Sequence, residues 1–264
     1  MRIVVIGGTG LIGSKVVRKL SDQGHEAVAA SPDSGVNTLT GEGLSEVLED
    51  AEVVVDVSNS RAFDEESATD FFTKATGNLL SYERAAGVKH HVALSVVGTD
   101  RPNEIGYFHA KAAQEKLIRE SSIRYSIVHA TQFFEFAKSI ADSSTLGQEV
   151  RVPSALIQPM AGDDVANAVA RVAVGAPLNR ILEIGGPEQF RFDEFVRLGL
   201  AAANDPRKVV ADPQARYFGA LLDERALVPG DGASLGEVRF EDWLSQRALG
   251  ATVQGATLAS GGRS

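Results

Sequence analysis

The stretch 2-RIVVIGGTGLIG-13 decides the fold of this 264-residue chain. Residues 2–6 are short, β-branched and apolar, which is typical of a strand that is covered on both faces. A GxxGxxG string follows directly, and residues 11–20 then carry apolar side chains at helical spacing. A glycine-rich turn between a strand and a helix predicts a dinucleotide-binding unit. The alternative is a glycine-rich turn that holds no ligand.

Each glycine of this turn has a distinct expected role. Gly7 allows a tight turn, Gly10 lets the backbone approach a pyrophosphate, and Gly13 lets the helix pack closely on the sheet. The pyrophosphate is expected to rest on free N–H groups at the helix N-terminus. The predicted contacts at this turn are therefore Gly7, Thr9, Gly10, Leu11, Ile12 and Gly13.

Strand-like and helix-like runs alternate through the first half of the chain. Such alternation predicts parallel strands with right-handed crossovers, and hence an α/β doubly wound sheet. After the first strand and helix, the expected strands are 27–30, 52–57, 91–97 and 125–130, and the expected helices are 44–48, 68–86 and 110–120.

The pattern is weaker beyond residue 130. It predicts a helix that begins near Asp163 or Asp164, either of which suits an N-cap, then a strand at 181–184 and a helix at 193–203 opened by Asp193. Three regions follow from this: a dinucleotide-binding core at 1–130, a part that completes the sheet and forms a small substrate-binding cap at 131–250, and a polar tail at 251–264, preceded by a short element at 240–244.

Composition excludes several classes of protein. Hydrophobic residues make up 44% and charged residues 23%, as in ordinary globular proteins. The chain has no cysteine, which excludes a disulfide scaffold and thiol catalysis, and its five histidines show no metal-ligand spacing, so no metal site is expected. The net charge of −9 argues against nucleic acid as a partner. No apolar run reaches the ~18 residues of a membrane span, so we expect a cytoplasmic protein without a membrane partner.

The residues after the second strand bear on the choice of cofactor. An acidic residue there would hold the ribose 2′-hydroxyl of NAD, and an arginine would hold the 2′-phosphate of NADP. This chain has Ser31, a late acid at Asp33, and neither arginine nor lysine nearby. Ser31 is expected to contact either ribose, and the choice between NAD and NADP stays open.

A YxxxK spacing joins Tyr107 to Lys111, which share one helix face. A lysine beside a phenol favours the phenolate and would lower the pKa of Tyr107. Tyr107 could then protonate a carbonyl oxygen as hydride arrives, Lys111 could also hold the nicotinamide ribose, and Ser95 could hydrogen-bond the same carbonyl oxygen. The alternative is a surface tyrosine beside a solvated lysine.

Taken together, these motifs resemble the atypical short-chain dehydrogenase/reductase superfamily, and in particular its NmrA-like, NAD(P)H-binding branch. The stretches that carry the resemblance are GGTGLIG at 7–13, VVVDVSNS at 53–60, VALSVVG at 92–98, YFHAK at 107–111, GDDVANAV at 162–169 and EIGGPEQF at 183–190.

The resemblance implies a Rossmann domain, a small C-terminal substrate region and bound NAD(P)H. It implies further cofactor contacts at Ser58, Asn59 and Ser60, and relatives often form homodimers. The chain departs from the branch in lacking the usual arginine near the end of the second strand. Some relatives bind the dinucleotide only to sense redox state.

An aromatic stretch follows the fifth strand, at the sheet edge where such folds bind ligands. Thr131 and Gln132 are expected to face the substrate, together with Phe133, Phe134 and Phe108. A flat apolar pocket is one interpretation, and core packing under the cap is the other.

These observations predict an NAD(P)H-dependent oxidoreductase. Its substrate would be a hydrophobic, aromatic, polyketide-like small molecule with a ketone or quinone carbonyl, and a reduced quinone that reacts with oxygen would account for hydroxylation. The alternative is a redox-sensing NAD(P)-binding regulatory protein without turnover.

Overall fold

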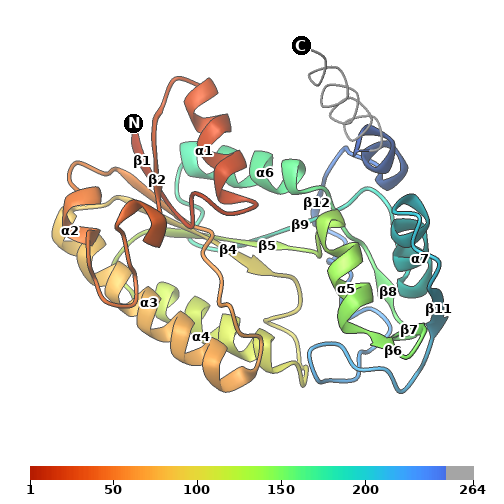
Figure 1. Cartoon of the computed structure of the whole chain (residues 1–264). Helices are drawn as coiled ribbons and strands as arrows, with labels where there is room; N and C mark the ends of the chain where they lie inside the picture. The colour runs from red at the N-terminus through yellow and green to blue at the C-terminus, as the bar shows by residue number, and fades with distance from the viewer. Residues whose placement is uncertain (248–264) are drawn as a thin grey trace, which may run out of the picture.

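A seven-stranded parallel sheet lies at the centre of the computed structural model, which describes residues 1–247 (Figure 1). The strand order is β12-β9-β5-β4-β3-β1-β2, and every adjacent pair is parallel. This confirms the expected doubly wound α/β fold. The strands are β1 (Arg2–Ile6), β2 (Glu26–Ala30), β3 (Val53–Asp56), β4 (His90–Val96), β5 (Tyr125–Ala130), β9 (Ile181–Gly185) and β12 (Ser234–Leu235).

Helices cover both faces of this sheet (Figure 1). One face packs against α1 (Gly13–Asp22) and α6 (Gly162–Val174), and the other against α2 (Leu44–Val47), α3 (Glu65–Ala86) and α4 (Gly106–Glu120). The alternation in β1 explains the two layers, since Ile3 and Val5 join the apolar cluster with α1 and α6 while Val4 and Ile6 join the cluster with α2 and α3.

Helix α3 begins at Glu65, three residues before the expected start. Its N-cap is Asp64, whose side chain accepts a hydrogen bond from the Ser67 N–H at 2.9 Å. Helix α4 begins at Gly106, so that Tyr107 lies in its first turn.

The expected capping role of Asp163 and Asp164 is wrong. The N-cap of α6 is Ala161, and the side chain of Glu135 accepts from the Gly162 N–H at 3.2 Å. Asp163 pairs instead with Lys15 of α1 at 2.6 Å, and Asp164 accepts from the backbone N–H groups of residues 237 and 238. Both carboxylates therefore join α6 to other segments. Asp193 likewise does not cap α7, whose N-cap is Arg191.

The residues after β5 also build a second, smaller part beside the sheet. Its core is aromatic and includes Phe192, Phe195 and Phe240, all fully buried. Residues 240–247 are helical, and the expected tail at 251–264 lies outside the described residues. The other elements here are η2 (Phe134–Phe136), α5 (Ala137–Ser143), β6 (Thr145–Leu146), β7 (Glu149–Val152), β8 (Leu156–Ile157), β10 (Phe190–Arg191), α7 (Phe192–Ala202) and β11 (Lys208–Ala211); η1 (Pro32–Ser34) follows β2.

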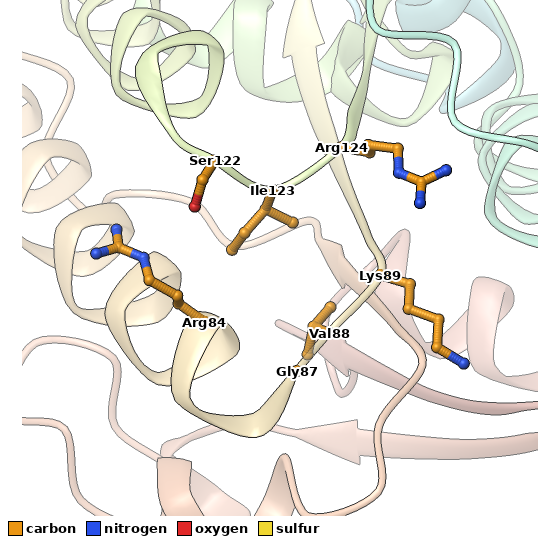
Figure 2. A pocket seen from close by; sticks show the side chains of 7 residues that line it. All are labelled: Arg84, Gly87, Val88, Lys89, Ser122, Ile123 and Arg124. Atoms are coloured by element: carbon orange, nitrogen blue, oxygen red, sulfur yellow. The ribbon is translucent and has the colours of Figure 1, made fainter.

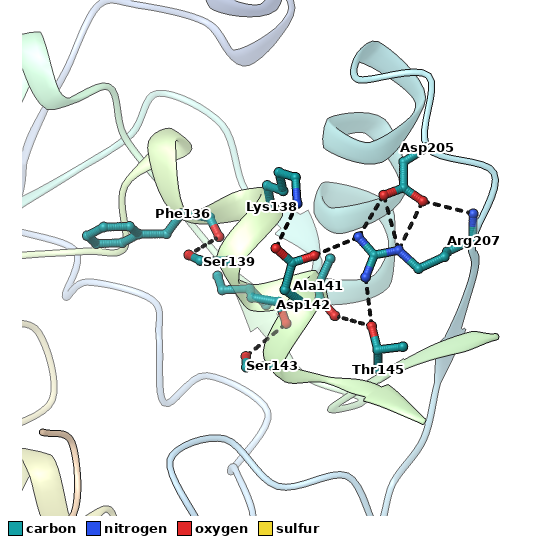
Figure 3. A network of polar contacts seen from close by, with 10 residues as sticks. Phe136, Lys138, Ser139, Ala141, Asp142, Ser143, Thr145, Asp205 and Arg207 are labelled. Carbon is teal, nitrogen blue, oxygen red and sulfur yellow. Dashed lines mark hydrogen bonds and ion pairs between the residues drawn. The ribbon is translucent and has the colours of Figure 1, made fainter. Parts of the chain in front are cut away.

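Arg207 ties the short strands of this part to α5 (Figure 3). Its guanidinium donates to Asp205 at 2.6 Å, to Asp142 at 2.8 Å and to the Thr145 hydroxyl at 2.8 Å. The hydrogen bonds that Arg207 donates to Asp205 hold the pKa of Asp205 at about 2. One side chain thus fixes the end of α5 against the strand that follows α7.

No helix within residues 1–247 has the length and apolar character needed to cross a membrane.

A buried ion pair between α3 and β4 gives a test of the packing. His91 Nδ1 lies 2.8 Å from Glu83 Oε1, and both side chains are fully buried. We predict that Glu83→Leu lowers the free energy of unfolding by ~3–5 kcal/mol, because it leaves His91 buried without its partner. The double variant Glu83→Leu/His91→Leu should lose much less.

Urea unfolding of both variants measures this difference. Glu120→Gln is the matched control, since it breaks the exposed pair with Lys116 and should change stability by ~0–1 kcal/mol. Equal losses in the single and the double variant would contradict the prediction.

Candidate functional site

The glycine turn between β1 and α1 is shaped by close backbone contacts. Gly7 has φ +76°, and the Gly10 N–H donates to the Gly7 carbonyl at 3.0 Å. A Cβ on Gly13 would lie 2.1 Å from the same carbonyl oxygen, so no other residue fits there. Thr9, Gly10 and Leu11 are exposed at the turn. Ile12 is buried, which leaves only its backbone for a ligand.

A general property of helices and one observation on Ser31 fit a dinucleotide at this turn. The first N–H groups of a helix have no intrahelical partner and suit a pyrophosphate. Ser31, at the end of β2, is buried, and its hydroxyl has no hydrogen-bond partner among the described residues. An unpaired buried hydroxyl costs ~1–3 kcal/mol, so a ribose hydroxyl is a suitable partner. Ser31 can contact the ribose of NAD and of NADP alike, so the choice between the two cofactors stays open.

The loop after β3 lies against the turn, since a Cβ on Gly7 would be 3.0 Å from Ser58. The Ser58 hydroxyl donates a hydrogen bond to Asp56 Oδ1 at 2.6 Å, and the Ser60 hydroxyl accepts one from the Ala62 N–H at 3.2 Å. Asn59 is exposed and accepts from the Tyr107 hydroxyl at 2.7 Å. The loop therefore joins the expected cofactor site to the expected catalytic tyrosine.

Tyr107 is not paired with Lys111. Burial raises the pKa of Tyr107, and its hydrogen bond to Asn59 offsets this only in part. The expectation that Lys111 lowers the pKa of Tyr107 is wrong for the protein without ligand, because the Lys111 ammonium donates to Leu94 and Gln114 instead. The Tyr107 hydroxyl is thus a neutral donor, which is the form that can give a proton to a carbonyl oxygen.

Lys111 lies in a buried chain of polar contacts between α4 and the sheet. Its Nζ donates to the Leu94 carbonyl at 2.9 Å and to the Gln114 side chain, which in turn donates to Asp56 Oδ2 at 3.0 Å. The ammonium also lies 4.3 Å from the centroid of the Phe72 ring. Burial lowers the pKa of Lys111 to about 8, against the opposing effect of Asp56 and Glu115.

Ser95 does not fit its expected role of orienting a carbonyl. Its hydroxyl donates to Glu115 at 2.5 Å and is buried. Glu115 Oε1 also accepts from Thr99 and lies 2.9 Å from His129 Nε2. Although burial opposes it, the hydrogen bonds from His129, Ser95 and Thr99 hold the pKa of Glu115 below its usual value.

Three potential metal ligands gather near this cluster. A ring nitrogen of His129 and one carboxylate oxygen each from Asp100 and Glu183 lie within 4.8 Å of one another. Arg101 donates to Glu183 at 2.7 Å and already supplies a positive charge there. Sequence spacing does not reveal this group, because its members come from two strands and a loop.

The residues after β5 divide into two sets. Thr131 and Gln132 are buried at the carboxyl end of the strand, and Thr131 Oγ1 and Gln132 Oε1 have no partner in the described structure. Such orphaned atoms suit a ligand contact. Phe133 is half-buried and stacks on Phe136 with ring centroids 5.2 Å apart.

The expectation that Phe108 and Phe134 line a substrate pocket is wrong. Both side chains are at most 2% exposed and belong to the aromatic core of the C-terminal part. Phe134 packs against Phe240 and Trp243. The interpretation as core packing therefore holds for these two phenylalanines.

Two surface pockets lie away from this site. One, of about 270 Å³, is lined by Arg84, Lys89 and Arg124 at the opposite end of β4 and β5 (Figure 2). In Figure 2 the Arg84 side chain points away from Lys89 and Arg124, so the three cations do not converge on one ligand. The other pocket lies between α6 and β12. Neither pocket is lined by the glycine turn or by Tyr107.

This fold and turn define a dinucleotide-binding protein with a Rossmann-like fold. A family model described as NAD(P)H-binding matches residues 7–174, and the chain belongs to that family. The cofactor is therefore NAD(P)H. The chain is 25% identical over 235 residues to the photosystem II assembly factor Ycf39 of Synechocystis, covering 81% of this chain and 72% of that protein.

Solved structures with bound dinucleotide share the fold. A short-chain dehydrogenase/reductase superfamily protein from Agrobacterium tumefaciens with bound NAD has a TM-score of 0.72 at 16% identity, covering 98% of this chain and 100% of that one. The NADPH-dependent quinone oxidoreductase QOR2 of Escherichia coli with NADPH has a TM-score of 0.68 at 16% identity, covering 93% and 99%.

We predict that Gly10→Ala weakens NAD(P)H binding by about tenfold or more, because the added methyl group crowds the pyrophosphate. The fold should tolerate the change, since the new Cβ would meet only the Gly7 carbonyl, at 3.2 Å. Fluorescence titration of NADH and NADPH measures the affinities. Gly77→Ala is the matched control, as its Cβ would meet nothing within 4 Å on α3. Unchanged affinity in Gly10→Ala would contradict the prediction.

The lowered pKa of Lys111 predicts a pH effect on stability. Between pH about 8 and 10.5 the folded protein has lost the Lys111 proton while the unfolded chain retains it, so stability rises with pH in this window. Below pH 8 the buried charge costs about 3 kcal/mol.

Comparison with Lys111→Met isolates this contribution. The difference in unfolding free energy between wild type and variant should shift in favour of wild type as the pH rises from 7.5 to 10. All other titratable groups are the same in both proteins, so their contributions cancel in this difference. A difference that stays constant across this range would show that Lys111 is not titrating there.

Proposed function

We propose that the protein is an NAD(P)H-dependent reductase of ketone or quinone carbonyls in hydrophobic, aromatic small molecules. The observation that carries the proposal is the position of Tyr107, whose neutral hydroxyl donates to exposed Asn59 in the loop beside the glycine turn. The dinucleotide, when bound, supplies the hydride. Quinone reduction is supported by analogy with the E. coli oxidoreductase of the same fold.

Tyr107 acts in this proposal as the proton donor. Asn59 holds the hydroxyl in place, and a substrate carbonyl oxygen replaces Asn59 as its hydrogen-bond acceptor. The raised pKa keeps the proton on Tyr107 until negative charge develops on that oxygen.

Lys111 acts in this proposal from behind the site. It holds a positive charge there through the chain that ends at Asp56, and because its buried Nζ already donates to Leu94 and Gln114, we do not assign it a direct contact with the ribose. Its pKa of about 8 leaves it mostly protonated at neutral pH. Ser95 takes no direct part, because Glu115 holds its hydroxyl.

The aromatic character of the substrate is supported by the surroundings of the phenol. Phe63 and Phe218 lie 5.5 Å from the Tyr107 ring, and Phe72 lies 6.0 Å from it. A flat apolar ring gains ~0.5–1.5 kcal/mol from each such contact beyond area burial. A hydroquinone product can react with oxygen, so hydroxylation by this route needs no metal or flavin on the protein.

A second candidate function is dinucleotide binding without turnover. Its support is the relative named as an assembly factor, which matches most of this chain. Such a protein would hold NAD(P)H and change its affinity for a partner with the redox state. Turnover with a quinone separates the two functions.

We predict that Tyr107→Phe lowers turnover of 1,4-naphthoquinone by ~10²–10⁴-fold, because the proton donor is lost. NAD(P)H affinity should stay within about twofold, since Tyr107 hydrogen-bonds Asn59 and not Lys111. Steady-state oxidation of NADH and NADPH measures the rates, and fluorescence titration measures the affinities.

Tyr125→Phe, at the start of β5 and far from the turn, is the matched control and should retain full activity. Full turnover in Tyr107→Phe would refute the proton-donor role. Tight dinucleotide binding by wild type without turnover on a panel of quinones and aldehydes would favour the second candidate.

A further inference from the structure

A tight turn of the C-terminal part carries Phe218 in a conformation that phenylalanine disfavours. Tyr217 and Ala220 pair as an antiparallel bridge, with N–H···O distances of 2.8 and 3.2 Å. The two residues between them, Phe218 and Gly219, have φ +48° and +82°. Positive φ at both central positions defines a turn that favours asparagine and glycine. A phenylalanine there costs ~1–2 kcal/mol.

The base of this turn is anchored in the C-terminal core. Tyr217 packs edge-on against Phe192, with ring centroids 5.6 Å apart, and Arg216 donates to the Gly219 carbonyl at 2.8 Å. The turn therefore presents the Phe218 side chain in a defined direction. Residues that the surrounding structure holds in a disfavoured backbone conformation are found most often at active sites and ligand sites.

The tip of the turn reaches the candidate active site. The Phe218 ring stacks on Tyr107 with centroids 5.5 Å apart and an interplanar angle of 26°. Phe63, from the loop after β3, lies 5.3 Å from Phe218 and 5.5 Å from Tyr107. Phe63 is 47% exposed and Phe218 38% exposed, which is unusual for side chains of this size. Three segments far apart in sequence thus meet at one phenol.

We propose that Phe63 and Phe218 form an aromatic clamp that binds the flat ring of the substrate beside the Tyr107 hydroxyl. Phe218 stacks on Tyr107 in the protein alone, and an aromatic ligand takes over these stacking contacts. The clamp selects polycyclic aromatic carbonyl compounds over small aliphatic ones. This inference rests on the proposed reductase function, and it replaces Phe108 and Phe134 with residues that a ligand can reach.

The test uses Phe218→Asn and Phe63→Ala in the full chain. Asparagine tolerates positive φ, so Phe218→Asn keeps the turn while it removes the ring. Leu221→Ala, which removes a 44% exposed apolar side chain from the same segment, is the matched control. Each variant is assayed with NADPH or NADH against 9,10-phenanthrenequinone and against diacetyl.

Each clamp variant should raise KM for phenanthrenequinone by about three- to tenfold, with KM for diacetyl and for the dinucleotide unchanged. The melting temperature of Phe218→Asn should not fall, because the strain at this turn is relieved. Equal changes for the two substrates, or none in either variant, would overturn the clamp.

A binding measurement separates failure of the clamp from failure of the reductase. Calorimetry with 1-naphthol on protein saturated with the oxidised dinucleotide requires no turnover. Lower naphthol affinity in both clamp variants but not in Leu221→Ala supports the clamp even if wild type reduces no quinone. No naphthol binding by wild type, or equal affinity in all four proteins, overturns it.

Discussion

The contact between Gly13 and the Gly7 carbonyl is the constraint on which the rest of the site depends. A side chain on Gly13 would bring a carbon within 2.1 Å of that oxygen, so α1 can start this close to β1 only because residue 13 is glycine, and the φ of +76° at residue 7 favours glycine there as well. This approach directs the first N–H groups of the helix along the turn, where an anion can meet them. The missing side chain of Gly7 also lets the turn lie against the loop after β3, which carries Asn59, because a Cβ there would be 3.0 Å from Ser58. One short stretch of backbone thus connects the glycine turn to the Tyr107 hydroxyl, which donates to Asn59.

Helix α4 carries Tyr107 and Lys111, and buried polar contacts fix its position. A chain of hydrogen bonds runs from Lys111 through Gln114 to Asp56 and so joins the helix to β3. Glu115 lies within hydrogen-bond distance of Ser95, Thr99 and His129, which come from the neighbouring strands and a loop. Such networks rigidify a core most when every member is satisfied, and here His129 Nδ1 has no partner within residues 1–247. The cost of burying Lys111 is evident in its pKa of about 8.

The C-terminal part completes the site from the other side. Its aromatic core, around Phe192, Phe195 and Phe240, is independent of the parallel sheet and supports the short turn that ends at Phe218. Arg207 fixes the surrounding strands to α5 (Figure 3). The Rossmann half carries the glycine turn and most of the match to the NAD(P)H-binding family, while the C-terminal part brings Phe218 into contact with Tyr107.

The sequence by itself determined the β1–turn–α1 unit, the order of the main elements and the position of Tyr107 and Lys111 on one helix, because these depend on local periodicity and on residues close in the chain. It could not show which partner each polar group meets. Ser95 donates to Glu115 and Lys111 donates to Gln114, while Phe108 and Phe134 are buried. Neighbouring strands and the packing of helices on the sheet decide those contacts. The strands of two to four residues after β5 were too short to give a period. Phe218 gave no signal at all, because its contact with Tyr107 arises only where a turn 111 residues beyond Tyr107 folds back onto the phenol.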